Sequence, residues 1–204
     1  MMMNMKKALL MTVVALMATN ISAQEGYDDT KHEVAVSMGA VSNSQWLDIF
    51  EEVTSTVFTV GYVTFENEKF TGPFSAEYFY HANKWLGIGG IFVFGQSKQD
   101  VLVSKDLNGE AVNTYYSLLP AAKLDWLRKK HFGMYSKAAI GATLRHESVD
   151  YDTPTKEDYS HSAIHLNWQV SLLGIEAGSP RVRGFVELGV GEQGIAQIGM
   201  RYKF

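Results

Sequence analysis

The stretch that decides the fold is IAQIGMRYKF, Ile195–Phe204. Side chains along a β-strand alternate between its two faces. Every second position from Ala196 to Phe204 is apolar or aromatic, and the positions between them include Gln197, Arg201 and Lys203. One face therefore suits hydrocarbon and the other suits water, as in a strand that crosses a membrane within a closed β-barrel.

The same alternation recurs along the chain in segments separated by polar turns. His161–Ile175 separates best, because Ile164, Leu166 and Trp168 fall on one face and polar residues on the other. Each segment has the length of about ten residues that a tilted transmembrane strand needs. The eight predicted strands are Glu33–Ser42, Pro73–Ala82, Leu86–Gln96, Val112–Trp126, Gly133–Glu147, His161–Ile175, Val182–Gly191 and Ile195–Phe204.

The connections between these strands alternate in length. Residues 82–84, 128–131 and 177–181 are short polar turns, whereas residues 43–72, 97–111 and 148–160 form long connections. Barrels of the outer membrane have short periplasmic turns and longer extracellular loops, so we expect the long connections to lie outside the cell. The last hairpin, at residues 191–194, breaks the alternation because it is tight.

The first long connection has two patterns of its own. From Ser44 to Val57, apolar residues such as Trp46, Ile49 and Phe50 recur at helical spacing, which predicts a short amphipathic helix. The following Phe58–Glu66 alternates like a strand and would bring the count to nine. Since bacterial barrels close with even numbers, we interpret it as an extension above the membrane, with ten strands as the alternative.

The N-terminus has the layout of a secretory signal peptide. Lys6 and Lys7 precede an apolar run over residues 8–17, and small residues end at Ala23. The run is too short to span a bilayer as a helix, which takes about 20 residues. We therefore expect residues 1–23 to be cleaved during export and residues 24–204 to form one barrel domain.

Composition narrows the class of protein further. The chain of 204 residues has a formal charge of -4 and no basic block, so nothing indicates binding to nucleic acid. It has no cysteine, which excludes disulfides and a lipid-attachment cysteine. The structural alternative is a soluble lipocalin-like barrel, in which the apolar faces of the strands would point inward around a ligand and the polar faces would point outward. The aromatic residues near strand ends on the apolar faces favour the membrane: Tyr78, Tyr80, Trp126, Tyr202 and Phe204.

The polar faces of the strands carry charges of both signs. An eight-stranded barrel is just wide enough for side chains to fill, so we expect these charges to pair across the lumen. A structural network is the favoured interpretation, and a small gated pore is the alternative. The predicted network consists of Glu77, Lys123, Asp125, Lys137, Arg145, Glu187 and Arg201.

The pattern as a whole resembles the small eight-stranded outer-membrane barrels, the OmpA-like and OmpX-like class, over residues 32–204. That resemblance implies residence in the outer membrane of a Gram-negative cell. It also implies that the barrel-assembly machinery reads the final strand through Ile198, Met200, Tyr202 and Phe204. It includes no catalytic motif and therefore transfers architecture and location without an activity.

The histidines are the starting point for an enzyme or metal hypothesis. On a strand, His161 and His165 would lie about 13 Å apart, too far to share an ion, so no metal site is predicted. His146 and Ser148 lie two apart on one face at the end of a strand, where a base and a nucleophile could meet. The alternative function is therefore a hydrolase of lipid A in the outer leaflet, although only Asp150 is near as an acid.

The sequence thus favours a non-enzymatic barrel without cofactors. We expect a monomer that contacts outer-membrane lipid and acts as a scaffold or as a surface-interaction protein. Its extracellular segments, such as the acidic Asp150–Asp158, would contact a ligand or partner outside the cell, since exposed loops on a rigid scaffold often bind.

Overall fold

A computed structural model describes residues 30–40, 42–44, 63–103, 106–151 and 159–204. The predicted signal peptide, residues 1–23, lies outside the described residues, and so does the predicted helix apart from Ser44. Most of the acidic segment at residues 150–158 lies outside them as well. No helix in the described part of the chain is long and apolar enough to cross a membrane.

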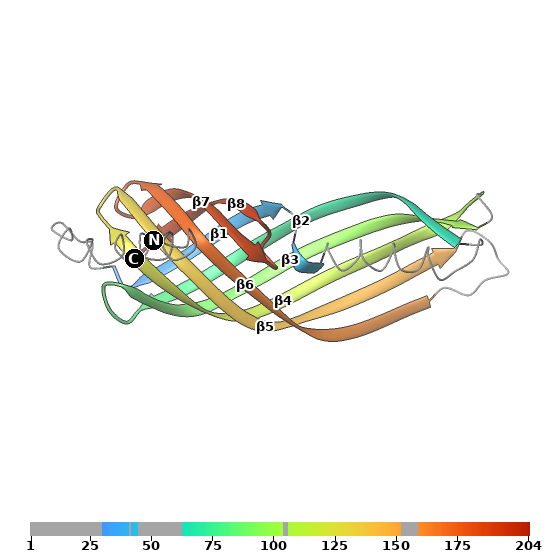
Figure 1. The fold of residues 1–204 in the computed structure, drawn as a ribbon, viewed down its shortest axis with the longest axis horizontal. Helices are drawn as coiled ribbons and strands as arrows, with labels where there is room; N and C mark the ends of the chain where they lie inside the picture. Colours follow the sequence, from blue (N-terminus) through green and yellow to red (C-terminus); the bar gives the residue numbers. More distant parts are fainter. Residues whose placement is uncertain (1–29, 41, 45–62, 104–105, 152–158) are drawn as a thin grey trace, which may run out of the picture.

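The described residues form one closed antiparallel barrel in which each strand pairs with its neighbours in sequence and β8 pairs with β1 (Figure 1). This confirms the predicted all-β barrel and its count of eight strands. The strands are β1 (His32–Ala40), β2 (Val63–His81), β3 (Leu86–Val103), β4 (Asp106–Arg128), β5 (Phe132–Tyr151), β6 (Tyr159–Gly178), β7 (Val182–Gly191) and β8 (Ala196–Lys203).

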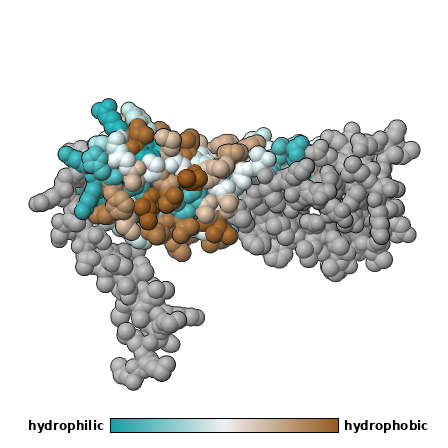
Figure 2. Space-filling view, turned by 90° about the horizontal axis from the view of Figure 1, so that it is seen from above, coloured by the Kyte–Doolittle hydropathy of each residue, from teal (hydrophilic) through white to brown (hydrophobic). Residues whose placement is uncertain are grey.

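Alternation of side chains gives the barrel an apolar exterior. In β7, exposed and buried residues alternate from Val182 to Gly191 without exception. Ile164 and Leu166 on β6 are 75% and 74% exposed, whereas a soluble protein would bury such a row of large apolar side chains in its core. Figure 2 shows hydrophobic side chains over the visible face of the described barrel, with hydrophilic residues at its end. The exterior is therefore the apolar face that the sequence predicted.

The eight strands differ greatly in length. β1, β7 and β8 have 9, 10 and 8 residues, whereas β2 to β6 have between 18 and 23. The five long strands continue past the ends of the three short ones as a sheet (Figure 1). Most of the predicted long loop at 97–111 is consequently strand, with pairs from Gln99↔Ala111 to Val103↔Asp106. The predicted loop at 148–160 is strand at both of its ends, up to Tyr151 in β5 and from Tyr159 in β6. β2 likewise begins at Val63 and absorbs part of the predicted extension.

The two ends of the barrel are distinct. The β2–β3, β4–β5 and β6–β7 turns lie at one end, where the backbone of His32 also bonds that of Phe204. We call this the turn end, and the opposite end the long-strand end. The turns are tight: at β2–β3, the Asn83 side chain accepts hydrogen bonds from the amides of Trp85 and Leu86.

Extra residues in the strands change which positions point inward. Tyr135 pairs with Gly174 and Lys137 with Ser171, so β6 contains one residue more than β5 over this interval. A second extra residue lies in β4, between Asp125 and Leu127. Beyond each of these β-bulges the alternation changes phase. Inward positions on β6 are therefore odd-numbered before the bulge and even-numbered after it.

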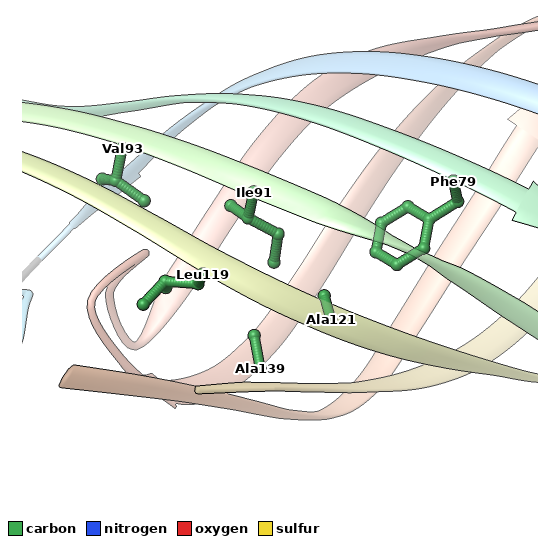
Figure 3. Packing of buried hydrophobic residues seen from close by; sticks show 6 residues of the cluster. All are labelled: Phe79, Ile91, Val93, Leu119, Ala121 and Ala139. Carbon is green, nitrogen blue, oxygen red and sulfur yellow. The ribbon is translucent and has the colours of Figure 1, made fainter. Parts of the chain in front are cut away.

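The lumen is filled by two kinds of side chain. Along β2 to β5 lies an apolar cluster whose members are at most 7% exposed, shown in Figure 3: Phe79, Ile91, Val93, Leu119, Ala121 and Ala139. The remaining inward positions are mostly polar or charged. The sequence predicted a polar lumen, and this apolar cluster was not part of that prediction. The lumen therefore contains an apolar part along β2 to β5 and a charged part beside it.

Candidate functional site

Six of the seven residues predicted for the lumen network are buried inside the barrel: Glu77, Lys123, Asp125, Lys137, Glu187 and Arg201. The seventh, Arg145, lies apart from them. It is near the long-strand end of β5, where its guanidinium lies 4.0 Å from Glu147 and both side chains keep some exposure. The structure therefore brings six of these side chains together and leaves one outside.

The middle of the lumen is organised around Lys137. Its Nζ lies 2.5 Å from Oε1 of Glu77 and 2.8 Å from Oε1 of Glu187. Glu77 also accepts a hydrogen bond from Gln193 at 2.7 Å, and Glu187 accepts one from the Tyr135 hydroxyl at 2.8 Å. Each carboxylate thus has a cation and a neutral donor, the arrangement that buried charges require.

A second cluster lies toward the turn end around Glu33 and Glu176, neither of which was predicted. Lys123 Nζ lies 2.7 Å from Glu33 Oε1, and Arg183 lies 2.6 Å from Glu176 Oε1. Arg201 contacts both carboxylates and so links the two. Lys203 also bonds Glu176. All of these side chains are at most 1% exposed, so the cluster is closed to solvent.

His81 is held between two carboxylates at the same end. Its Nε2 lies 3.1 Å from Glu33 and its Nδ1 lies 3.2 Å from Asp125. Each ring nitrogen of His81 therefore faces a carboxylate oxygen inside the barrel. The Arg128 guanidinium lies 3.8 Å from Asp125 and adds a cation on that side.

Aromatic rings complete the packing around Arg201. Its Cζ lies 4.7 Å from the centre of the Tyr135 ring and 4.6 Å from that of Phe185. Lys123 Nζ lies 4.2 Å from the Tyr135 ring. The rings fill space beside the two cations, and each cation–π contact attracts a cation that is already paired with a carboxylate.

The charges of the described lumen balance. Six acidic residues are buried: Glu33, Glu77, Asp125, Glu176, Glu187 and Glu192. Six basic residues are buried with them: Lys123, Arg128, Lys137, Arg183, Arg201 and Lys203. The described lumen therefore carries as many buried acidic side chains as buried Lys and Arg side chains, and buried charges of both signs can pair with one another.

The β7–β8 turn forms a polar cap above this network. The tight hairpin at residues 191–194 folds inward, so that Glu192 and Gln193 are 1% and 0% exposed. Glu192 accepts hydrogen bonds from the amide and hydroxyl of Ser44, from Ser117 at 2.7 Å and from Asn167 at 2.8 Å. This one carboxylate therefore ties β4, β6 and Ser44, which follows β1 in the chain, to the last hairpin.

The partners of His146 and Ser148, the two residues of the hydrolase hypothesis, differ from the predicted ones. His146 is exposed and its Nδ1 lies 2.9 Å from the hydroxyl of Ser162 on β6, across the strand pair. Ser148 instead pairs in register with Ser160. The described residues contain no group of three or more His, Cys, Asp or Glu able to hold a metal ion.

The predicted assembly residues Ile198, Met200, Tyr202 and Phe204 all point outward and are between 43% and 61% exposed. The ring of Phe204 stacks on those of Tyr202 and His32, with centroids 5.8 Å and 5.4 Å apart. His32 also bonds the Tyr78 hydroxyl at 2.9 Å. An aromatic group thus surrounds the β8–β1 seam at the turn end.

Solved structures to which this chain is similar include two of Ail, the attachment invasion locus protein of Yersinia pestis. One, in complex with the heparin analogue sucrose octasulfate, is 14% identical, with a TM-score of 0.46 over 85% of this chain and 99% of that chain. The other is 13% identical, with a TM-score of 0.45 over 86% of this chain and 97% of that one.

The protein is a small eight-stranded antiparallel barrel. The closed eight-stranded barrel that the resemblance implied is confirmed by the strand topology. No family model matches the chain, and no curated protein matches it either. Identity this low carries no information about shared ligands or activities.

Proposed function

We propose that this protein is a sealed outer-membrane barrel that holds a five-stranded sheet outside the cell as an interaction surface. The observation that carries the proposal is the continuation of β2 to β6 beyond β1, β7 and β8. The protein acts as a scaffold and surface-interaction protein, without catalysis.

Membrane residence is supported by the distribution of polarity. Among the described residues, the buried charges lie in the lumen, while large apolar side chains such as Leu118, Leu172 and Ile198 are more than 60% exposed. In water these side chains would need a second layer to cover them, whereas in lipid they need none. A soluble lipocalin-like barrel would have the reverse polarity. Export through the signal peptide at residues 1–23 would bring the chain to the outer membrane of a Gram-negative cell.

The sheet beyond the membrane is long enough to form a surface. A tilted strand crosses the bilayer with about 9–11 residues, so strands of 18 to 23 residues have about ten to spare. At about 3.3 Å per residue the surplus extends about 30 Å along the strands. The turn end, with short turns, would face the periplasm and the long-strand end would face outside.

Charge indicates the kind of partner that this surface fits. Residues 41–72, 97–114 and 144–168 together contain 13 Asp and Glu against 5 Lys and Arg. An acidic surface attracts cationic partners and repels polyanions. The partner proposed is therefore a basic protein segment outside the cell.

Two measurements test the sealed barrel. An intact barrel runs faster on a gel without boiling than after boiling, and a soluble domain does not. Identical mobility would contradict membrane residence. In planar bilayers we expect no resolvable single-channel steps, because the lumen is filled by paired charges. Steps that persist in purified protein would favour the small gated pore instead.

The interaction surface is tested by trimming one hairpin. Replacing residues 147–161 by Asn-Gly joins His146 to Ser162, which already face each other in register, and removes five acidic residues. We expect vesicles carrying the full chain to retain a labelled 12-residue lysine peptide at 0.15 M salt, and the trimmed barrel to retain less. Equal retention of a 12-residue glutamate peptide would contradict the proposal. Replacing residues 100–110 in the same way shows which hairpin contributes.

A further inference from the structure

Among the described residues, the exposed Lys, Arg, Asp and Glu side chains at the turn end are all basic: Lys31 lies just before β1, and four others lie in the turns. Lys84 lies in the β2–β3 turn, Lys129 and Lys130 in the β4–β5 turn, and Arg181 in the β6–β7 turn. These four exposed residues are called the basic rim. The carboxylates of this end, Glu33, Asp125 and Glu176, point into the lumen and are buried there. Figure 2 shows hydrophilic side chains at this end beside the brown exterior.

The basic rim lies directly at the edge of the apolar exterior. Lys84 is followed by Trp85, which is 54% exposed, and Arg181 is followed by Val182, which is 44% exposed. After Lys130 and His131 comes Phe132, which is 37% exposed. Successive residues rise about 3.3 Å along a strand, so these cations lie within one or two residues of the hydrocarbon boundary. That is the depth of the lipid headgroups, where aromatic side chains also gather.

The rim surrounds the barrel. Its residues come from the turns between β2 and β3, β4 and β5, and β6 and β7, which follow one another around the circumference. Overall composition does not explain it, since the chain has a formal charge of -4 and the segments at the long-strand end are acidic. The backbone under the rim is fixed as well: Arg183 donates hydrogen bonds to the carbonyls of Lys129 and Lys130.

We propose that the basic rim binds the phosphates of anionic phospholipids in the leaflet that contacts the turns. The inference rests on the proposed membrane residence and adds a ligand to it. Three sides of the circumference each supply at least one cation at headgroup depth, so a ring of lipids fits better than a single soluble anion. The acidic cell-wall polymer is a poorer fit, because it lies in the periplasm and not at the hydrocarbon boundary.

The expected size of the effect follows from surface electrostatics. One Lys or Arg near an anionic membrane surface favours binding by about fivefold at physiological salt, and the effect fades within a Debye length. Several cations that share neighbouring lipids should therefore enrich anionic lipid around the turn end several-fold. High salt should remove the enrichment while leaving the barrel folded.

Trp85 is the reporter for the experiment, since it adjoins Lys84 and is exposed on the lipid side. The chain has four tryptophans, and replacing Trp46, Trp126 and Trp168 by Phe leaves Trp85 alone. The folded protein is placed in phosphatidylcholine vesicles that contain phosphatidylglycerol, with chains brominated near the headgroup on one lipid or the other. Stronger quenching by the brominated phosphatidylglycerol at equal mole fraction measures its preference.

We expect phosphatidylglycerol to be preferred over phosphatidylcholine at least threefold in 0.1 M salt and equally in 1 M salt. Replacing Lys84, Lys129, Lys130 and Arg181 by Gln should abolish the preference. The matched control is Lys98→Gln, an exposed cation toward the long-strand end, which should leave the preference unchanged.

Four outcomes decide between the alternatives. A preference lost in the rim variant and kept in Lys98→Gln supports the proposal. A barrel that shows the gel shift in phosphatidylcholine yet has no lipid preference overturns it while membrane residence stands. Rim-dependent binding of soluble peptidoglycan fragments without any lipid preference overturns it in favour of the cell wall. Absence of the gel shift would overturn membrane residence itself.

Discussion

Lys137 on β5 and Glu77 on β2 meet inside the barrel with 2.5 Å between Nζ and Oε1, and both side chains are fully buried. Their strands are not neighbours in the sheet, so this contact crosses the lumen. The same Nζ lies 2.8 Å from Glu187 on β7. Lys137 therefore braces three separate parts of the wall against one another.

Lys137→Met should destabilise the barrel by about 3–5 kcal/mol, because it leaves buried Glu187 without its cation and leaves Glu77 with Arg201 alone, at 3.5 Å. Urea unfolding in lipid vesicles, followed by tryptophan fluorescence, measures the loss. The double variant Lys137→Met with Glu187→Gln should recover part of it, since one uncompensated charge is removed. An equally large loss in the double variant would show that shape matters at this site and charge does not.

Gly194→Ala should destabilise the β7–β8 turn. Gly194 has a φ of +96°, and a Cβ added there would lie 2.4 Å from the carbonyl oxygen of Ala40. The backbone conformation alone costs a non-glycine residue about 1–3 kcal/mol. The control is Gly184→Ala on β7, where an added Cβ meets nothing within 4 Å. Similar unfolding curves for the two variants would contradict this account.

Glu192→Leu should loosen the polar cap. It removes the acceptor for Ser44, Ser117 and Asn167, and each buried donor left unpaired costs about 1–3 kcal/mol. We expect faster amide hydrogen exchange at Ser44, whose N–H bonds Glu192 directly. Glu192→Gln keeps an acceptor oxygen and should have an intermediate effect. Unchanged exchange at Ser44 in the Leu variant would mean that other contacts hold the cap.

His146→Ala and Ser148→Ala should leave the acylation of lipid A unchanged in cells that express the protein. The structure gives His146 a hydrogen bond to Ser162, so the predicted pairing with Ser148 is not the observed one. Mass spectrometry of extracted lipid A is the measurement, with Ser162→Ala as a third variant. Loss of an acyl chain that depends on His146 would establish the hydrolase alternative.

The barrel could be predicted from the sequence because alternation is a local property. Assigning successive residues of each strand to alternate faces places Glu77, Lys137 and Arg201 on the inner face, and the structure buries all three. Glu33 was also accessible to counting, since it shares parity with Ala35 and Ser37 in the same predicted strand. Glu33 was not predicted because it is the first residue of its predicted strand, and a polar residue at that position is equally typical of a strand end and of a turn.

Other parts of the site could not be found by counting. Glu176 and Arg128 follow the bulges in β6 and β4, and an extra residue reverses the expected face of everything after it. Glu192 lies in a turn, where no period applies, and its burial depends on how the hairpin packs against β4 and β6. Bulges and inward turns are set by tertiary packing, which leaves no repeat in the sequence.

The β1–β8 seam has a consequence for the order of folding. Seven strand pairs join neighbours in sequence and can form as hairpins, but β1 and β8 are separated by most of the chain. Glu33 comes from one side of this seam and Arg201 and Lys203 from the other, so their buried pairs exist only once the seam has closed. In a half-closed sheet, Glu33, Arg201 and Lys203 would lose water without gaining their partners across the seam. Partly closed intermediates are therefore unfavourable. Closure should therefore be the slow and cooperative last step of folding.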